Sequence, residues 1–264
     1  MMTRRGFAGV AAGTVAAGVA GAAAKKLRLG IGAYTYHGLN VDEMIAEMKA
    51  QKITEMEMSR GEFMTFAKPP VERFESFRQK IDAAGIRCVS YYAPTIKNQQ
   101  QLDDAVRFAK ILGAQNISGD PVGEWLAATD ERLTKEGMTF GIHNHYFKEK
   151  FVYESPEDLL NAAKGRSRTI GFTLDLGHII SCGFDTLDAV RKLIAKTRVI
   201  HLKDIKAAGG EINVPLGTGL VKVPEVMAEL KRVGFEGLIA FEYEKEGDIR
   251  QDVAQQLAYA RKLL

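Results

Sequence analysis

Short apolar stretches alternate with amphipathic stretches from residue 27 to the end of the chain, and this alternation limits the possible folds more than any other feature. The first pair is typical. Residues 27–34 (LRLGIGAY) have the composition of a strand, and residues 41–50 (VDEMIAEMKA) place their apolar side chains on one helical face. Asn40 precedes that helix as an N-cap, and Glu43 stands three residues later, as in a capping box.

Seven further strand-like stretches follow, each with an amphipathic segment after it. They lie at 53–59, 86–93, 114–119, 138–145, 170–178, 198–204 and 237–244. Strands that alternate with helices form parallel sheets, and eight such units in about 240 residues are typical of a (β/α)8 TIM barrel. An open, doubly wound sheet would carry a glycine-rich phosphate turn after its first strand, whereas the turn here reads YTYHGLN. Glycines before several strands predict left-handed helix C-caps at Gly85, Gly113, Gly137 and Gly234.

The first 24 residues differ in composition from the rest of the chain. Arg4 and Arg5, with Phe7 two positions on, precede a run of alanines and glycines, which is typical of a twin-arginine signal peptide. The run is too short and too rich in glycine to anchor the protein stably in a membrane. We therefore expect a signal peptide at 1–24, a single barrel domain at 25–264 and an exported, periplasmic protein.

Charge and cysteine usage exclude two classes of protein. Lys and Arg total 36 against 33 Asp and Glu, a formal charge of +3, and the chain has no dense basic run. Nucleic acid is therefore not a predicted partner. The two cysteines, Cys88 and Cys182, are too few for a disulfide framework, and we expect both to be free.

Polar residues stand where four consecutive strands, the fifth to the eighth, end. The fifth offers His143 and His145, and the next three offer Asp175, His201 and Glu242. Enzymes of this architecture keep their active site at the carboxyl ends of the strands, and the period of two lets these side chains face the same mouth. Imidazoles and carboxylates together predict one divalent transition metal, such as Mn, Co, Zn or Fe, with positions left open for sugar hydroxyls.

The order and spacing of these motifs resemble the xylose isomerase-like barrels, which include the sugar phosphate isomerases and epimerases. The motifs that carry the resemblance are MEMS with Glu57, GIHNH, LDLGH with Asp175 and His178, HLKD with His201, and FEYE with Glu242. The resemblance implies a single divalent metal held by His143, Asp175, His201 and Glu242. Family isomerases typically carry Glu at the first of these positions, where it shares proton transfer with the glutamate of strand eight, so His143 argues against a two-glutamate mechanism.

We hypothesise that the protein abstracts a proton next to the carbonyl of a carbohydrate, as a sugar isomerase or epimerase would, with metal assistance. His145 or Glu242 would be the base, and Lys203 would help to stabilise the oxyanion. A lyase that eliminates the aglycone from 3-keto-glycosides stays an alternative, because both reactions pass through the same enolate. A sugar-binding barrel without activity is a third possibility. Endonuclease IV, from the same superfamily, would imply three metals and a basic groove, which the sequence does not suggest.

Further residues are predicted to bind substrate. These are Glu57, which could equally be a structural hydrogen-bond partner, His178, Asp204, His37 and the single tryptophan, Trp125, as a stacking surface for a sugar ring. Phe63, Met64 and Phe66 predict an exposed loop that covers the substrate or meets a neighbouring subunit, so a homo-oligomer stays open.

Overall fold

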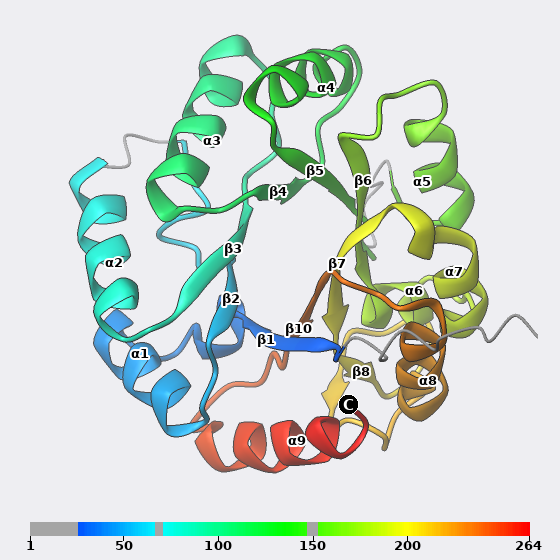
Figure 1. Cartoon of the computed structure of the whole chain (residues 1–264). Coiled ribbons are helices and arrows are strands. Elements are labelled where there is room, and N and C mark those ends of the chain that lie inside the picture. Colours follow the sequence, from blue (N-terminus) through cyan, green and yellow to red (C-terminus); the bar gives the residue numbers. More distant parts are fainter. Residues whose placement is uncertain (1–25, 67–70, 147–152) are drawn as a thin grey trace, which may run out of the picture.

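Eight parallel strands close into a barrel in the computed structural model, which describes residues 26–66, 71–146 and 153–264 (Figure 1). The strand order around the barrel is β1-β10-β7-β6-β5-β4-β3-β2, and β1 pairs with β2 to complete the ring. The barrel strands are β1 (Arg28–Gly32), β2 (Glu55–Met58), β3 (Arg87–Tyr92), β4 (Asn116–Gly119), β5 (Thr139–His143), β6 (Ile170–Asp175), β7 (Thr197–Leu202) and β10 (Leu238–Phe241). The predicted barrel and all eight of its strands are thus confirmed.

Helices surround the barrel on its outside (Figure 1). They are α1 (Val41–Ala50), α2 (Val71–Ala83), α3 (Gln99–Leu112), α4 (Trp125–Glu136), α5 (Pro156–Ala163), α6 (Leu176–Ser181), α7 (Thr186–Leu193), α8 (Val223–Val233) and α9 (Arg250–Lys262), with short 3-10 turns η1 (Ala33–Tyr36) and η2 (Ile194–Lys196). Two features were not predicted: α6 starts directly after β6, and an antiparallel pair, β8 (Asp204–Ile205) and β9 (Asn213–Val214), extends the loop after β7. None of the helices in the described ranges is long and apolar enough to cross a membrane.

Local sequence signals fix the ends of the helices. The Asn40 side chain accepts a hydrogen bond from the Glu43 backbone at 3.0 Å, and the Glu43 carboxylate accepts one from the Asn40 backbone at 2.9 Å, which confirms the predicted capping box. The predicted left-handed glycines are also confirmed, with positive φ at Gly85, Gly113, Gly137 and Gly234. The predicted signal peptide at 1–24 lies outside the described residues and stays a prediction.

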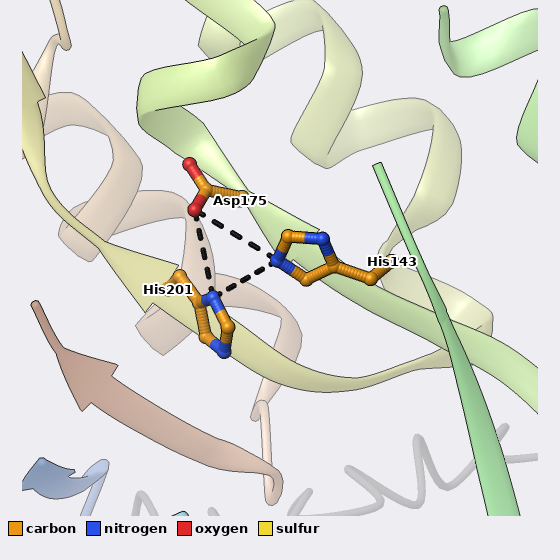
Figure 2. A group of neighbouring side chains, drawn as sticks. All are labelled: His143, Asp175 and His201. Carbon is orange, nitrogen blue, oxygen red and sulfur yellow. Dashed lines mark hydrogen bonds and ion pairs between the residues drawn. The ribbon is translucent and has the colours of Figure 1, made fainter. Parts of the chain in front are cut away.

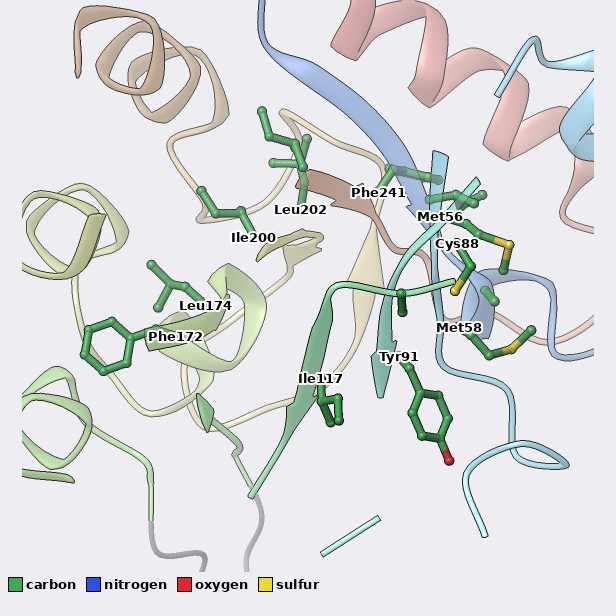
Figure 3. Packing of buried hydrophobic residues seen from close by; sticks show 14 of the residues in the cluster. Met56, Met58, Cys88, Tyr91, Ile117, Phe172, Leu174, Ile200, Leu202 and Phe241 are labelled. Atoms are coloured by element: carbon green, nitrogen blue, oxygen red, sulfur yellow. The ribbon is translucent and has the colours of Figure 1, made fainter. Parts of the chain in front are cut away.

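The apolar core lies between the barrel and its helices. Outward side chains of the strands, such as Met56, Ile117 and Phe172, belong to one buried cluster (Figure 3). Phe74 of α2 and Phe108 of α3 stack in this layer with ring centroids 4.2 Å apart. Phe63 joins them and is 1% exposed, so the prediction of an exposed aromatic loop is wrong at this residue, because α2 offers it an aromatic pocket.

The inside of the barrel is unusually polar. The Ser118 hydroxyl of β4 lies 2.6 Å from both the Glu57 carboxylate of β2 and the Thr173 hydroxyl of β6. These pairs join strands that are not neighbours, so the bonds must cross the interior. Barrels of this kind usually fill that space with branched apolar side chains. Cys88 and Cys182 are both free, as predicted.

Candidate active site

Three buried side chains point toward one another at the carboxyl ends of β5, β6 and β7 (Figure 2). His143 Nε2 lies 3.1 Å from His201 Nδ1, and Asp175 Oδ2 lies 3.5 Å from His201 Nδ1 and 3.9 Å from His143 Nε2. Strand pairing sets the residues at this level, because Asp175 is directly opposite His201 in the sheet. Each side chain is at most 3% exposed.

These three residues fit a metal site. Their ligand atoms lie within 4.8 Å of one another. Bonds of about 2.1 Å to a transition metal would place neighbouring ligand atoms about 3.0–3.5 Å apart, close to the spacing observed here. Asp175 Oδ2 is buried, has no hydrogen-bond partner of good geometry and lies 3.1 Å from the Lys203 ammonium group, so it faces a region of positive charge in which a metal ligand can stay ionised.

Glu242, the fourth predicted ligand, stands beside this group. Its Oε2 lies 3.4 Å from His201 Nδ1. Gly32 on the neighbouring strand β1 leaves the space for it, since a Cβ there would lie 2.6 Å from Glu242 Oε1. Burial raises the pKa of Glu242 to about 7, against the attraction of His201 and Lys203. The carboxyl group can therefore hold or release a proton near neutral pH.

Glu57 orients His201 from inside the barrel. Its fully buried carboxylate contacts His201 Nε2 and accepts hydrogen bonds from Ser90 and Ser118, both at 2.6 Å. Burial alone would raise the pKa of Glu57, but the attraction of His201 and these hydrogen bonds outweigh it and lower the pKa. In the neutral imidazole that a metal requires, an anionic Glu57 keeps the proton on Nε2, so Nδ1 would present its lone pair to the bound ion. The structure thus places Glu57 as a hydrogen-bond partner of His201, behind the cavity rather than on its wall.

A cavity of about 310 Å³ opens above the metal-ligand group. The predicted residues on its wall are His143, His145, Asp175, His178, His201, Lys203 and Glu242. The structure thus brings together all the residues predicted to hold the metal or act in catalysis, and one of those predicted to bind substrate. A cavity of this size suits a ligand such as a monosaccharide.

Lys203 supplies the positive charge of the cavity. Its Nζ lies 2.7 Å from Glu244 Oε1, 3.1 Å from Asp175 Oδ2 and 3.8 Å from Glu242 Oε2. Burial alone would lower the pKa of Lys203, but Asp175, Glu244 and Glu242 outweigh it and raise the pKa. The ammonium group therefore stays protonated at neutral pH and can stabilise an oxyanion.

His145 contacts the cavity from the loop after β5. Its Nε2 lies 2.7 Å from the Tyr92 hydroxyl. Burial lowers the pKa of His145 to about 4, so its imidazole is neutral at neutral pH and can accept a proton. His178 lies nearby, with Nε2 3.8 Å from Asp175 Oδ2, and burial lowers its pKa to about 3.

Besides Glu57, three residues predicted to bind substrate do not line the cavity. Trp125 begins α4 and is partly buried against the apolar core. His37 stacks on Tyr34, which lines the cavity, with ring centroids 5.1 Å apart. Asp204 is 1% exposed, and both of its oxygens accept backbone N–H groups, those of Ile205 and of the 217–221 loop. Its carboxylate holds that loop in shape, and no acceptor is left for a substrate.

Met64, from the loop predicted to cover the substrate or meet a neighbouring subunit, also lines the cavity, and several residues on its wall were not predicted: Tyr34, Ser59, Tyr92, Glu211 and Glu244. Three of them follow an inward residue by two positions, as Tyr92 follows Ser90 and Glu244 follows Glu242. The same period of two that selected the ligands could have found them. Glu211 comes from the loop before β9, and no local signal marks it.

Comparison with known proteins agrees with this architecture. A family model described as xylose isomerase-like TIM barrel matches residues 43–263. An inosose dehydratase of Clostridium perfringens is 22% identical over 81% of this chain and 77% of its own length. Among solved structures, a D-tagatose 3-epimerase-like protein has a TM-score of 0.71 at 15% identity, with 90% of this chain and 97% of that chain covered. A 3-keto-D-glucoside 4-epimerase of E. coli has a TM-score of 0.70 at 13% identity, with 90% and 100% covered. At these identities, the two structures show a shared fold.

Proposed function

Because the chain belongs to the xylose isomerase-like TIM barrel family, we propose that it is a metal-dependent enzyme that removes a proton next to the carbonyl of a small carbohydrate. One observation carries this proposal. Buried imidazole and carboxylate groups of β5, β6 and β7 converge at the floor of a cavity of about 310 Å³ that also holds Glu242 and a buried lysine. Named relatives of this fold, a sugar epimerase and an inosose dehydratase among them, act on such compounds.

His143, Asp175 and His201 would hold the metal, with Glu242 beside them. A bound divalent ion would supply a Lewis acid that polarises the carbonyl and a neighbouring hydroxyl of the sugar. His143 in place of the family's usual glutamate leaves Glu242 as the carboxyl group on the cavity wall that lies near both the ligand His201, at 3.4 Å, and Lys203, at 3.8 Å. The metal's identity is open among Mn, Co, Zn and Fe, since all four accept this set of ligand atoms.

The side chains can move the proton themselves. Glu242 or His145 takes the proton from the carbon next to the carbonyl, and the electron pair of the C–H bond forms the enolate. Lys203 Nζ, protonated among three carboxylates, stabilises the enolate oxygen. Glu242 at the end of β10 and His145 after β5 reach the cavity from different strands, with β6 and β7 between them. One can remove the proton and the other return it, to the opposite face for epimerisation or to the neighbouring carbon for isomerisation.

Elimination is the second candidate. His143 replaces one of the two glutamates of the family's usual proton shuttle. Two residues further on, His145 contacts the Tyr92 hydroxyl. After proton removal, the C–O bond at the next carbon can break, a C=C bond forms, and the leaving oxygen takes either the proton that His145 has just removed or the hydroxyl proton of Tyr92, which Tyr92 recovers from the protonated base. A 3-keto-glycoside would lose its aglycone in this way, and a keto-polyol would lose water.

The charge of the cavity favours an uncharged sugar. Its wall carries Asp175, Glu211, Glu242 and Glu244 against Lys203, and it has no arginine among the described residues. A phosphorylated substrate would meet net repulsion at this wall. We also propose that residues 1–24 direct export, which fusion of this segment to a reporter protein would test through its dependence on Arg4 and Arg5.

Proton NMR in deuterated water tests the reaction. The protein, loaded in turn with each of the four metals, is incubated with keto-hexoses and 3-keto-glycosides. Deuterium uptake next to the carbonyl, with the carbon skeleton kept, identifies an isomerase or epimerase, whereas released aglycone identifies a lyase. Lys203→Met should abolish either signal, while Lys206→Met, an exposed control nearby, should not. Sugar binding without turnover under every metal would instead indicate a binding protein and refute the proposal.

A further inference from the structure

A second and larger cavity lies at the opposite end of the barrel. Its volume is about 910 Å³, and its wall includes the amino-terminal residues of several barrel strands. Four arginines line it: Arg28 on β1, Arg78 on α2, Arg87 on β3 and Arg198 on β7. Nothing in the proposed reaction uses this space, because the metal-ligand residues stand at the carboxyl ends of the same strands.

The positive charges of this cavity are incompletely neutralised. Arg28 and Arg87 share one carboxylate, that of Glu55. Arg78 is paired with Asp82, an exposed residue of its own helix. Glu236 is the one carboxylate on the wall within the part of the chain that the structure describes. Four guanidinium groups thus face three carboxylates.

Arg198 holds the unmatched charge. Its Nη2 donates a hydrogen bond of 2.6 Å to the carbonyl of Arg168. Its Nε is buried and has no hydrogen-bond partner, and no ion pair of Arg198 occurs among the described residues. A buried N–H group of a charged side chain that lacks a hydrogen-bond partner lowers the stability of the folded protein. An acceptor near Arg198 would therefore be favourable.

The backbone is shaped to bring Arg198 into the cavity. The ladder between β6 and β7 pairs Phe172 with Thr197 and Thr173 with Val199, so Arg198 is the extra residue of a β-bulge. Gly171 on β6 lets the start of β7 approach closely, since a Cβ there would clash with the Lys196 carbonyl oxygen and lie 3.2 Å from Arg198 Nε. Positively charged side chains are often placed at helix C-termini, where they interact favourably with the helix dipole. Arg28, Arg87 and Arg198 belong to strands, so the helix dipole does not account for them.

We propose that this cavity is a binding site for a phosphate group, with Arg198 as its anchor and Arg28 and Arg87 as further donors. A guanidinium offers parallel N–H groups to phosphate oxygens, and the Arg198 side chain lies on the wall of this cavity. The cavity is large enough for a small phosphorylated molecule as well as for free phosphate. The ligand would bind at the end of the barrel away from the sugar site.

Titration calorimetry of the full-length, chelator-treated protein with inorganic phosphate in a low-salt chloride buffer tests the site. Removing metal first prevents phosphate from binding to a metal in the sugar site. We expect saturable binding of one phosphate, at least tenfold weaker in Arg198→Met and at least threefold weaker in Arg198→Lys, which keeps the charge but loses the fork. Lys231→Met, an exposed control on α8, and Lys203→Met, in the sugar site, should bind as the wild type does.

Three results would overturn the proposal. The first is heat that does not saturate, which would indicate only general attraction of anions. The second is unchanged affinity in both Arg198 variants, and the third is loss of binding in Lys203→Met, which would place the phosphate in the sugar site. Far-UV circular dichroism checks that Arg198→Met is folded; if it is not, Arg198→Lys decides the question.

Discussion

Replacing Glu57 by Gln should weaken metal binding although Glu57 is not a ligand. In the wild type, the anionic carboxylate contacts His201 Nε2 and accepts two hydrogen bonds of 2.6 Å from serine hydroxyls. Glutamine has the same shape, so its oxygen can still accept from Ser90 and Ser118. Its amide nitrogen then faces His201 Nε2 with a donor against a donor. The imidazole must move its proton to Nδ1, the atom that lies 3.1 Å from His143 Nε2 and 3.5 Å from Asp175 Oδ2.

The size of the effect follows from the loss of one oriented ligand. Changes to such supporting partners typically cost about 10-fold to 100-fold in metal affinity, or about 1.4–2.7 kcal/mol. Titration calorimetry with Mn, Co or Zn measures the dissociation constant directly and needs no substrate. Nitrogen-15 NMR of the imidazole adds an independent reading, because it reports which nitrogen of His201 carries the proton.

Glu55→Gln is the matched control. The substitution is chemically the same, and Glu55 lies on the same strand, two residues before Glu57. Its carboxylate, however, binds Arg28 and Arg87 instead of a histidine. Its metal affinity should equal that of the wild type. An unchanged dissociation constant in Glu57→Gln, or an equal loss in both variants, would refute the role assigned to Glu57.

Three further predictions concern catalysis and stability. His145→Gln should reduce turnover at least 100-fold and leave the metal dissociation constant unchanged, since His145 contacts Tyr92 and the cavity; a parallel loss of metal affinity would contradict this. Burial raises the pKa of Asp120 to about 6 in the folded protein, against about 3.9 in the unfolded chain. Between these two pH values the folded protein keeps a proton on Asp120 that the unfolded chain has lost, so the free energy of unfolding falls as the pH rises from about 3.9 to 6. In urea titrations from pH 4 to 7, Asp120→Asn should lack this fall and exceed the wild type at pH 7 by on the order of 3 kcal/mol, and equal pH profiles would speak against it. Phe74→Ala should lower the free energy of unfolding by about 3–5 kcal/mol in the same assay, because it empties a fully buried site stacked on Phe108; a loss below about 1 kcal/mol would show that the layer repacks.

The barrel and most of its site could be predicted from the chain alone, because their signals are local. The period of two in each strand and of 3.6 in each helix gave the eight units, and the polar residues that end strands five to eight marked the mouth. Closure of the sheet then brings His143, Asp175 and His201 together whatever the loops do.

Roles that depend on what lies across the barrel were decided only by the tertiary structure. Glu57 and Glu55 share a strand face, yet Glu57 contacts His201 of β7, 144 residues away in the sequence, whereas Glu55 binds two arginines. Asp204 and Trp125 both follow the ends of barrel strands in the sequence, which suggested that they bind substrate. In the structure, Asp204 accepts hydrogen bonds from a loop backbone and Trp125 packs against the apolar core.

The bulge in β7 had no signal in the sequence either. Simple alternation of inward and outward side chains along β7 would not predict that Arg198 lines the larger cavity at the end of the barrel opposite the metal-ligand residues. Periodicity therefore determines which elements form and which faces are polar. Partners across a closed sheet depend on register and bulges, which are set by contacts between distant strands.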